Sequence, residues 1–133
     1  MLIEVDDVKF KEEVLDDSSH LVLVDFWAEW CGPCRVMMPI INSIHEEMTE
    51  KVENKDNKVN LITPPPPKLK VVKVNIEECP KTREEYSIRS VPTIAVFFKG
   101  ELLATRTGAS SKKQLVDLLE EWIDKLSLGL DSS

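Results

Sequence analysis

Val24-Asp25-Phe26-Trp27-Ala28-Glu29-Trp30-Cys31-Gly32-Pro33-Cys34 is the stretch that decides the fold class of this chain. It joins an apolar run, residues 21–27, to two cysteines that are separated by two residues. The run is apolar on both faces of a period-two pattern, which is typical of a central strand covered on both sides. From Pro33, apolar residues recur at helical spacing and predict a helix to about Glu50, on a stripe of Met37, Ile41, Ile44 and Met48.

The cysteine pair therefore lies where a buried strand turns into a helix, and this position suits thiol–disulfide exchange. Only a thiolate attacks a disulfide, and a free cysteine with a pKa of about 8.5 is mostly protonated at neutral pH. The first turn of a helix offers unpaired N–H groups and the positive end of the dipole, which favour a thiolate. We expect Cys31 to be the exposed nucleophile. Cys34 lies one turn inward, where it can resolve a mixed disulfide.

Two other uses of the pair fit the sequence less well. A structural zinc site needs four ligands, and the remaining soft ligands, Cys79, His20 and His45, form no second spaced pair. A purely structural disulfide would close so short a loop that it would stabilise the fold little. We therefore expect no metal and a redox role.

Further elements follow on both sides of this segment. In chain order they are a strand 2–5, a helix to about Asp17 capped by Asp6 or Asp7, a strand 70–76, a short helix 80–86, a hairpin of strands 93–98 and 102–107, and a last helix from Ser110 or Ser111 on a stripe of Leu115, Leu119, Trp122 and Leu126. The order βαβαβαββα predicts an α/β fold, a three-layer α/β/α sandwich with a central mixed β-sheet.

Residues 51–69 interrupt this pattern with Lys, Asn, Asp and four consecutive prolines, Pro64–Pro67. The composition predicts a surface loop inserted in a single domain that spans 1–133. The prolines favour an extended polyproline II segment, which leaves open a second interpretation, a docking peptide for a proline-recognising module.

Net charge is −7 over 133 residues. An acidic surface disfavours nucleic acid and anionic membranes, which attract basic patches. The acidic start is unlike a signal peptide, and no apolar run reaches membrane-spanning length. Three cysteines do not suggest a secreted disulfide framework. We expect a cytoplasmic protein that binds neither membranes nor nucleic acid.

The stretch 24–34 resembles the active-site segment of thioredoxins. Residues 70–75 resemble the third strand of that family, and residues 88–93, Ile-Arg-Ser-Val-Pro-Thr, resemble its cis-proline loop. Gly100 fits the hairpin turn, and Thr107-Gly108-Ala109 the last loop that faces the substrate. The resemblance covers nearly the whole chain except about 51–69, so the thioredoxin fold is expected.

The resemblance implies roles for individual residues. Asp25 would be the buried carboxylate that exchanges a proton with Cys34, and its place in a strand that is apolar on both faces also predicts burial and a raised pKa. Lys73 would lie near Asp25 and limit that rise, although an exposed strand lysine is the alternative. Pro92 would be cis and face the cysteines. The surface that docks protein substrates, here called the docking patch, would comprise Trp30, Gly32, Pro33, Val91, Pro92, Gly108 and Ala109.

The implied activity is protein-disulfide reduction in cell redox homeostasis, with a redox-active Cys31–Cys34 disulfide and no bound cofactor. NADPH would supply electrons through thioredoxin reductase, and partners would include peroxiredoxin, ribonucleotide reductase or methionine sulfoxide reductase. The protein is expected to be a monomer. An oxidase or isomerase is the first alternative, although Gly32 and Pro33 replace the His that those relatives place before the second cysteine. A protein that only binds partners is the second. Cys79 is expected to be a small, partly buried residue, with a regulatory thiol as the alternative.

Overall fold

The computed structural model describes residues 2–55 and 66–129 of the chain. Its centre is a five-stranded sheet in the order β1-β3-β2-β4-β5. The strands are β1 (Ile3–Glu4), β2 (His20–Trp27), β3 (Lys68–Asn75), β4 (Thr93–Phe98) and β5 (Glu101–Thr107). β1, β3 and β2 run parallel, whereas β4 and β5 pair antiparallel. The sheet is mixed and β2 is its middle strand, as predicted.

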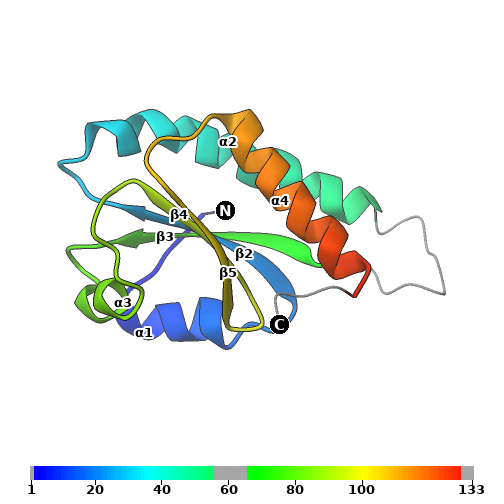
Figure 1. Cartoon of the computed structure of the whole chain (residues 1–133), viewed down its shortest axis with the longest axis horizontal. Helices are drawn as coiled ribbons and strands as arrows, with labels where there is room; N and C mark the ends of the chain where they lie inside the picture. Colours follow the sequence, from blue (N-terminus) through cyan, green and yellow to red (C-terminus); the bar gives the residue numbers. More distant parts are fainter. Residues whose placement is uncertain (1, 56–65, 130–133) are drawn as a thin grey trace.

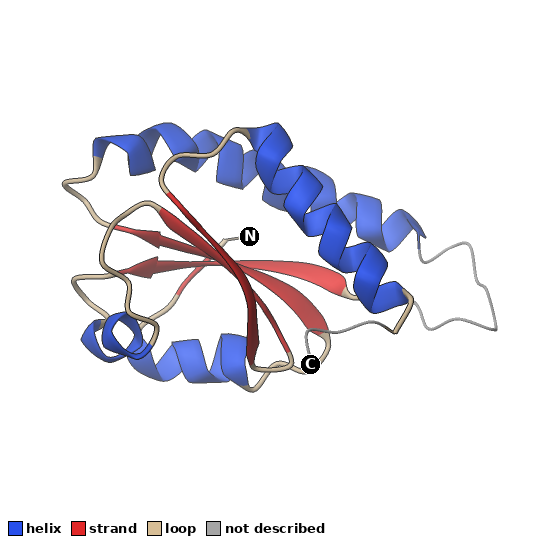
Figure 2. Cartoon of the chain, in the orientation of Figure 1, coloured by secondary structure: helices blue, strands red, loops and turns tan. Residues whose placement is uncertain are grey.

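Helices cover both faces of the sheet, which gives the predicted three layers (Figures 1 and 2). α2 (Gly32–Lys55) and α4 (Lys112–Ser127) lie on one face. The other face carries α1 (Asp7–Phe10), its π-helical continuation η1 (Lys11–Leu15) and α3 (Pro80–Glu85). The family expectation of a thioredoxin fold is confirmed.

Alternation along β2 builds two cores. Val22, Val24 and Phe26 pack toward α1 and α3, whereas Leu21 and Leu23 pack toward α2 and α4. All five side chains are fully buried. Asp25 lies on the same face of β2 as Leu21 and Leu23, because alternate residues of a strand point to the same side. A carboxyl group therefore lies among apolar side chains, at a position where the pattern predicts another aliphatic residue.

The sequence left open whether Asp6 or Asp7 caps the first helix, and in the structure each of these residues binds the start of a different helix. Asp6 caps α1, because its Oδ1 accepts a hydrogen bond from the backbone N–H of Lys9 at 2.7 Å. Asp7 reaches the first turn of α3 and accepts bonds from the N–H and hydroxyl of Thr82 at 2.9 and 2.8 Å. These contacts hold α3 against α1.

Three predictions of element placement were wrong. α2 extends past Glu50 to Lys55, and β3 begins at Lys68, so the predicted loop 51–69 is helix at its start and strand at its end. Residues 56–65 of that loop, with Pro64 and Pro65, lie outside the described residues, and Pro66 and Pro67 belong to no helix or strand. α4 buries Leu115, Leu118, Leu119 and Ile123, while Trp122 and Leu126 are only partly buried, because the buried stripe follows i, i+3, i+4 and i+8.

Candidate active site

The cysteine pair lies at the junction of β2 and α2. A turn after β2, closed by a bond from the N–H of Cys31 to the carbonyl of Ala28 at 3.1 Å, places Cys31 directly before the first helical residue, Gly32. A disulfide joins Cys31 to Cys34, whose Cα atoms are 5.3 Å apart. The N–H of Cys34 donates to Cys31 Sγ at 3.1 Å. A donor of the first turn therefore points at the sulfur that would carry the negative charge of a thiolate.

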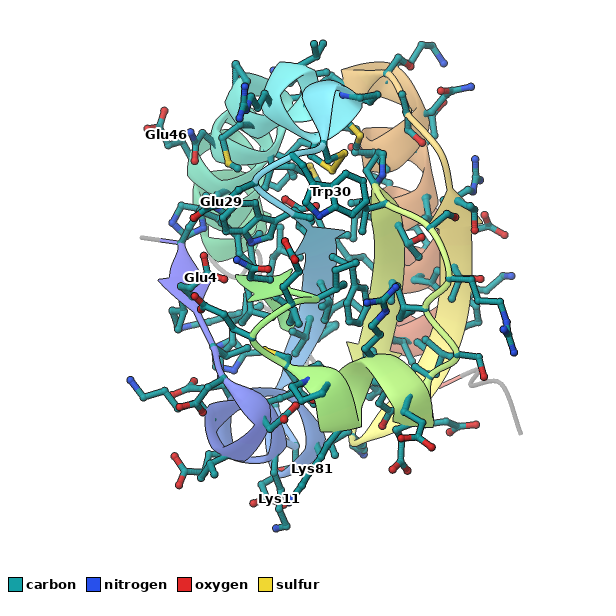
Figure 3. The ribbon with its side chains drawn as sticks, turned by 90° about the vertical axis from the view of Figure 1, so that its left-hand side faces the viewer. Glu4, Lys11, Glu29, Trp30, Glu46 and Lys81 are labelled. Carbon is teal, nitrogen blue, oxygen red and sulfur yellow. A yellow bond between two sulfur atoms is a disulfide. The ribbon has the colours of Figure 1, made fainter. Side chains whose placement is uncertain are left out.

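The expectation that Cys31 is exposed was wrong. Only 3% of Cys31 and 2% of Cys34 is accessible, and both side chains belong to the core on the α1 and α3 face of the sheet. The reason is that the disulfide turns Cys31 Sγ inward toward Cys34. The neighbours supply the accessible surface instead, since Gly32 and Pro33 are exposed and Trp30 is 65% exposed beside the disulfide (Figure 3).

Asp25 carries a carboxyl group that is buried without the hydrogen bonds that usually stabilise a buried polar group. It is 1% exposed, and neither of its oxygens has a hydrogen-bond partner among the residues that the structure describes. Burial raises its pKa from 3.8 to about 6; the positive charge of Lys73 opposes this rise and the negative charge of Glu4 adds to it. The group can therefore take up and release a proton near neutral pH, which is the property required of a general acid or base.

Lys73 lies opposite Asp25 in the β2–β3 register, but its ammonium group contacts Glu4 and the ring of Trp27. Lys73 Nζ lies 3.9 Å from Glu4 Oε1 and 4.6 Å from the centroid of the Trp27 ring. The side chain of Lys73 is 18% exposed, so the alternative of an ordinary exposed strand lysine does not hold. Glu4 also accepts a bond from Trp27 Nε1 at 3.2 Å. Sequence reasoning missed Glu4, because its position depends on a two-residue strand.

Strand register brings the docking patch to the cysteine end of the sheet. Phe26 of β2 pairs with Thr93 of β4, which pairs with Thr107 of β5, so the residues that flank these positions share one edge. The Val91–Pro92 bond is cis, as expected. The N–H of Gly108 donates to the carbonyl of Pro92 at 2.9 Å and ties two of the loops together.

Members of the docking patch differ in exposure. Pro92 is buried, whereas Val91 and Gly108 are partly buried and Ala109 is exposed. The exposed surface of the patch thus consists of Trp30, Gly32, Pro33 and Ala109.

Cys79 lies outside this site, and it is more buried than expected. It directly precedes α3 with no exposed surface, and its Sγ donates to the carbonyl of Val5 at 3.3 Å. Burial, together with the acidic neighbours Asp7 and Glu4, raises the pKa of this thiol to about 11. The thiol therefore stays protonated and inaccessible in the folded protein, which disfavours a regulatory role.

Neither a metal cluster nor a membrane-spanning helix is found among the described residues. Within 2–55 and 66–129, no three His, Cys, Asp or Glu side chains gather in a way that could hold a metal ion. Over the same residues, every helix is too short or too polar to cross a membrane.

Comparisons with known proteins agree with this geometry. The thioredoxin family model matches residues 1–121. The chain is 45% identical over 125 residues to a thioredoxin of Rickettsia typhi. This alignment covers 94% of the present chain and 98% of the Rickettsia protein. The chain is 42% identical over 123 residues to a thioredoxin of Buchnera aphidicola, with coverage of 92% and 97%, and 40% identical over 120 residues to one of Synechocystis, with coverage of 90% and 95%. With a CXXC disulfide at the start of α2, a carboxyl group buried in β2 and these relatives, the chain belongs to the thioredoxin family and is a protein dithiol–disulfide oxidoreductase.

Proposed function

We propose that this protein works as a reductase of protein disulfides, with Cys31 as the nucleophile and Cys34 as the resolving thiol. The observation that carries this assignment is the helix-start geometry. The N–H of Cys34 points at Cys31 Sγ and the dipole of the 24-residue helix α2 adds to its effect, so the reduced form favours a thiolate on Cys31.

The reaction has two exchange steps. In the first, the Cys31 thiolate attacks one sulfur of a substrate disulfide; a bond forms to that sulfur, and the other substrate sulfur leaves as a thiolate. In the second, the Cys34 thiol loses its proton and its sulfur attacks Cys31 Sγ. The mixed disulfide breaks, the substrate sulfur leaves as a second thiolate, and the Cys31–Cys34 disulfide forms. The substrate gains two electrons and the protein loses two.

Asp25 accepts the proton of Cys34 in the second step, through an intervening water. Its pKa of about 6 supports this role, because an acceptor near neutrality takes and returns a proton with little driving force in either direction. Lys73 limits the rise of that pKa. The docking patch receives the substrate backbone and side chains beside the disulfide, with Trp30 as its largest exposed member.

Electrons return from NADPH through thioredoxin reductase, since the family exchanges disulfides with that enzyme and with disulfide-bearing substrate proteins. Substrates of this chain include enzymes that form a disulfide in their cycle, such as peroxiredoxins, ribonucleotide reductase or methionine sulfoxide reductase. The protein acts as a monomeric single domain in the cytoplasm, where a reducing environment suits a free Cys79 and a reactive pair.

Insulin reduction in the presence of dithiothreitol tests the assignment. Cys31→Ser should abolish activity, and Cys34→Ser, reduced and then freed of dithiothreitol, should accumulate a mixed disulfide with insulin. Cys79→Ser is the matched control, because it removes a thiol outside the site and should retain wild-type activity. Full activity of the Cys31→Ser protein would mean that the nucleophile is wrongly assigned.

A further inference from the structure

A row of charged residues crosses three strands beneath the cysteine pair. Glu4 of β1 lies opposite Lys73 of β3, and Lys73 lies opposite Asp25 of β2. Residues directly opposite one another in neighbouring strands share a face and lie about 5 Å apart. Lys73 thus lies in the register between two acidic residues, one at the edge of the sheet and one at its centre.

The contacts of Lys73 favour the carboxylate at the edge. Lys73 Nζ lies 3.9 Å from Glu4 Oε1 and 4.6 Å from the Trp27 ring centroid. Trp27 Nε1 donates to the other oxygen of Glu4 at 3.2 Å, which closes a clamp of three side chains. Figure 3 shows Glu4 on β1, at the edge of the sheet.

Asp25 has no such clamp. Within residues 2–55 and 66–129, its two oxygens accept no hydrogen bond, and the charged groups that act on it are Lys73 from β3 and Glu4 from β1. Its partner on β4 is the buried Ile94, and the helices on this face contribute apolar side chains such as Met37 of α2 and Leu115 of α4. The balance between Lys73 and Glu4 therefore dominates the charge environment of Asp25.

We infer that Glu4 is a positioning residue for the exchange reaction: it holds the ammonium group of Lys73 against Trp27 and thereby limits how much of that positive charge stabilises the Asp25 carboxylate. The inference rests on the proton-transfer role proposed above for Asp25. Without the charge of Glu4, Asp25 loses a repulsive neighbour and gains an unshared cation. Both changes favour its ionised form.

Titration of Asp25 in the oxidised protein tests this coupling, because disulfide-bonded cysteines do not titrate and cannot mix with the carboxyl signal. The probe is the ¹³C chemical shift of the Asp25 carboxyl carbon between pH 4 and 9. Glu4→Gln removes the charge and retains an oxygen that can accept from Trp27 Nε1. It should lower the titration midpoint of Asp25 by about half a pH unit or more.

Glu78→Gln is the matched control. Glu78 is exposed and close enough to act electrostatically on Glu4, but its charge is not among those that act on Asp25. The substitution removes the same charge from the same side of the protein. An unchanged midpoint in Glu4→Gln, or an equal shift in Glu78→Gln, would overturn the inference.

A Lys73→Met background separates the clamp from a direct field. If Glu4 acts through Lys73, Glu4→Gln should shift Asp25 much less in this background than in the wild type. An undiminished shift would overturn the clamp, because the whole effect of Glu4 would then be direct repulsion of the Asp25 carboxylate.

The pH profile of insulin reduction separates this inference from the proposed function. If Asp25 accepts the proton of Cys34, the acidic limb of the rate profile should move with the midpoint in Glu4→Gln. A shifted midpoint with an unmoved rate profile would leave the clamp established and overturn the proton-transfer role of Asp25.

Discussion

Replacing Asp25 by Asn should stabilise the folded protein at high pH, although the residue is buried at the active site. The pKa of Asp25 is raised from 3.8 to about 6, a little over two units. Since one unit corresponds to 1.36 kcal/mol, the ionised carboxylate costs the folded state about 3 kcal/mol. The uncharged amide of Asn avoids most of this cost but buries a polar group without a partner, so we expect a net gain of about 2 kcal/mol.

The pH dependence has a definite sign. The folded protein binds the Asp25 proton more tightly than the unfolded chain does, so the stabilising contribution of the protonated group is complete below about pH 4. It is lost as the pH rises through about 6. The advantage of Asp25→Asn should therefore be small near pH 4.5 and reach its full size at pH 8.

Urea unfolding of the oxidised wild type and variant, followed by far-UV circular dichroism from pH 4.5 to 8, measures this difference. Other carboxyl groups titrate in both proteins and cancel in the comparison. If the variant were no more stable than the wild type at pH 8, or more stable by the same amount at every pH, the charge of Asp25 would not be the source of the cost.

Asp17→Asn provides a control of opposite sign. The side chain of Asp17 is 8% exposed and is paired with Lys70 Nζ at 2.6 Å and His20 Nδ1 at 2.8 Å. Burial opposes its ionisation, but hydrogen bonds from Lys70, His20 and Ser19 outweigh that effect and hold its pKa well below the ordinary value. Its contribution is present above about pH 4 and lost in acid. Asp17→Asn should therefore destabilise the protein at pH 8, by about 1–3 kcal/mol.

Three further predictions concern other sites. In the reduced native protein, Ellman's reagent should report two thiols, because Cys31 attacks the reagent and Cys34 resolves the mixed disulfide, and a third only after unfolding, because Cys79 is buried outside the site and its pKa is about 11; fast reaction of three thiols would contradict this burial. Gly100→Ala should cost about 1–2 kcal/mol in urea unfolding, because φ is +78° and the new Cβ would lie 2.8 Å from the carbonyl oxygen of Leu15; wild-type stability would contradict it. Trp30→Ala should slow insulin reduction several-fold but leave stability within about 0.5 kcal/mol, since Trp30 is 65% exposed; an unchanged insulin rate would remove it from the docking patch.

The elements with strong local patterns could be predicted from the sequence. β2 is apolar on both faces and is the central strand, and Lys99-Gly100 joins β4 to β5 with positive φ at both residues, as a two-residue hairpin turn requires. The cis bond before Pro92 was predicted only through the family resemblance, because the local sequence does not distinguish cis from trans there.

Elements without an apolar stripe could not be placed in the same way. The end of α2, residues 50–55, contains one apolar residue among Glu, Lys and Asn, so periodicity gave no signal there. Glu and Lys are nevertheless good helix formers, and propensity continued the helix where the pattern stopped. The burial of Cys31 could not be predicted either, because the core cluster that it joins gathers residues from distant parts of the chain, such as Ile76 and Ile88.

Asp25 and Glu4 show why one functional residue has a sequence signal and the other does not. Asp25 breaks the apolar pattern of a buried strand, and a local violation of this kind costs stability, so the pattern by itself indicates a function for that carboxyl group. Glu4 breaks nothing, because an acid in an exposed edge strand is ordinary. Its effect arises from the β1–β3 register, which sets it opposite Lys73, and from the indole of Trp27, which fixes its carboxylate. A residue that acts through partners distant in the sequence produces no local sequence pattern, so Glu4 could be found only from the structure.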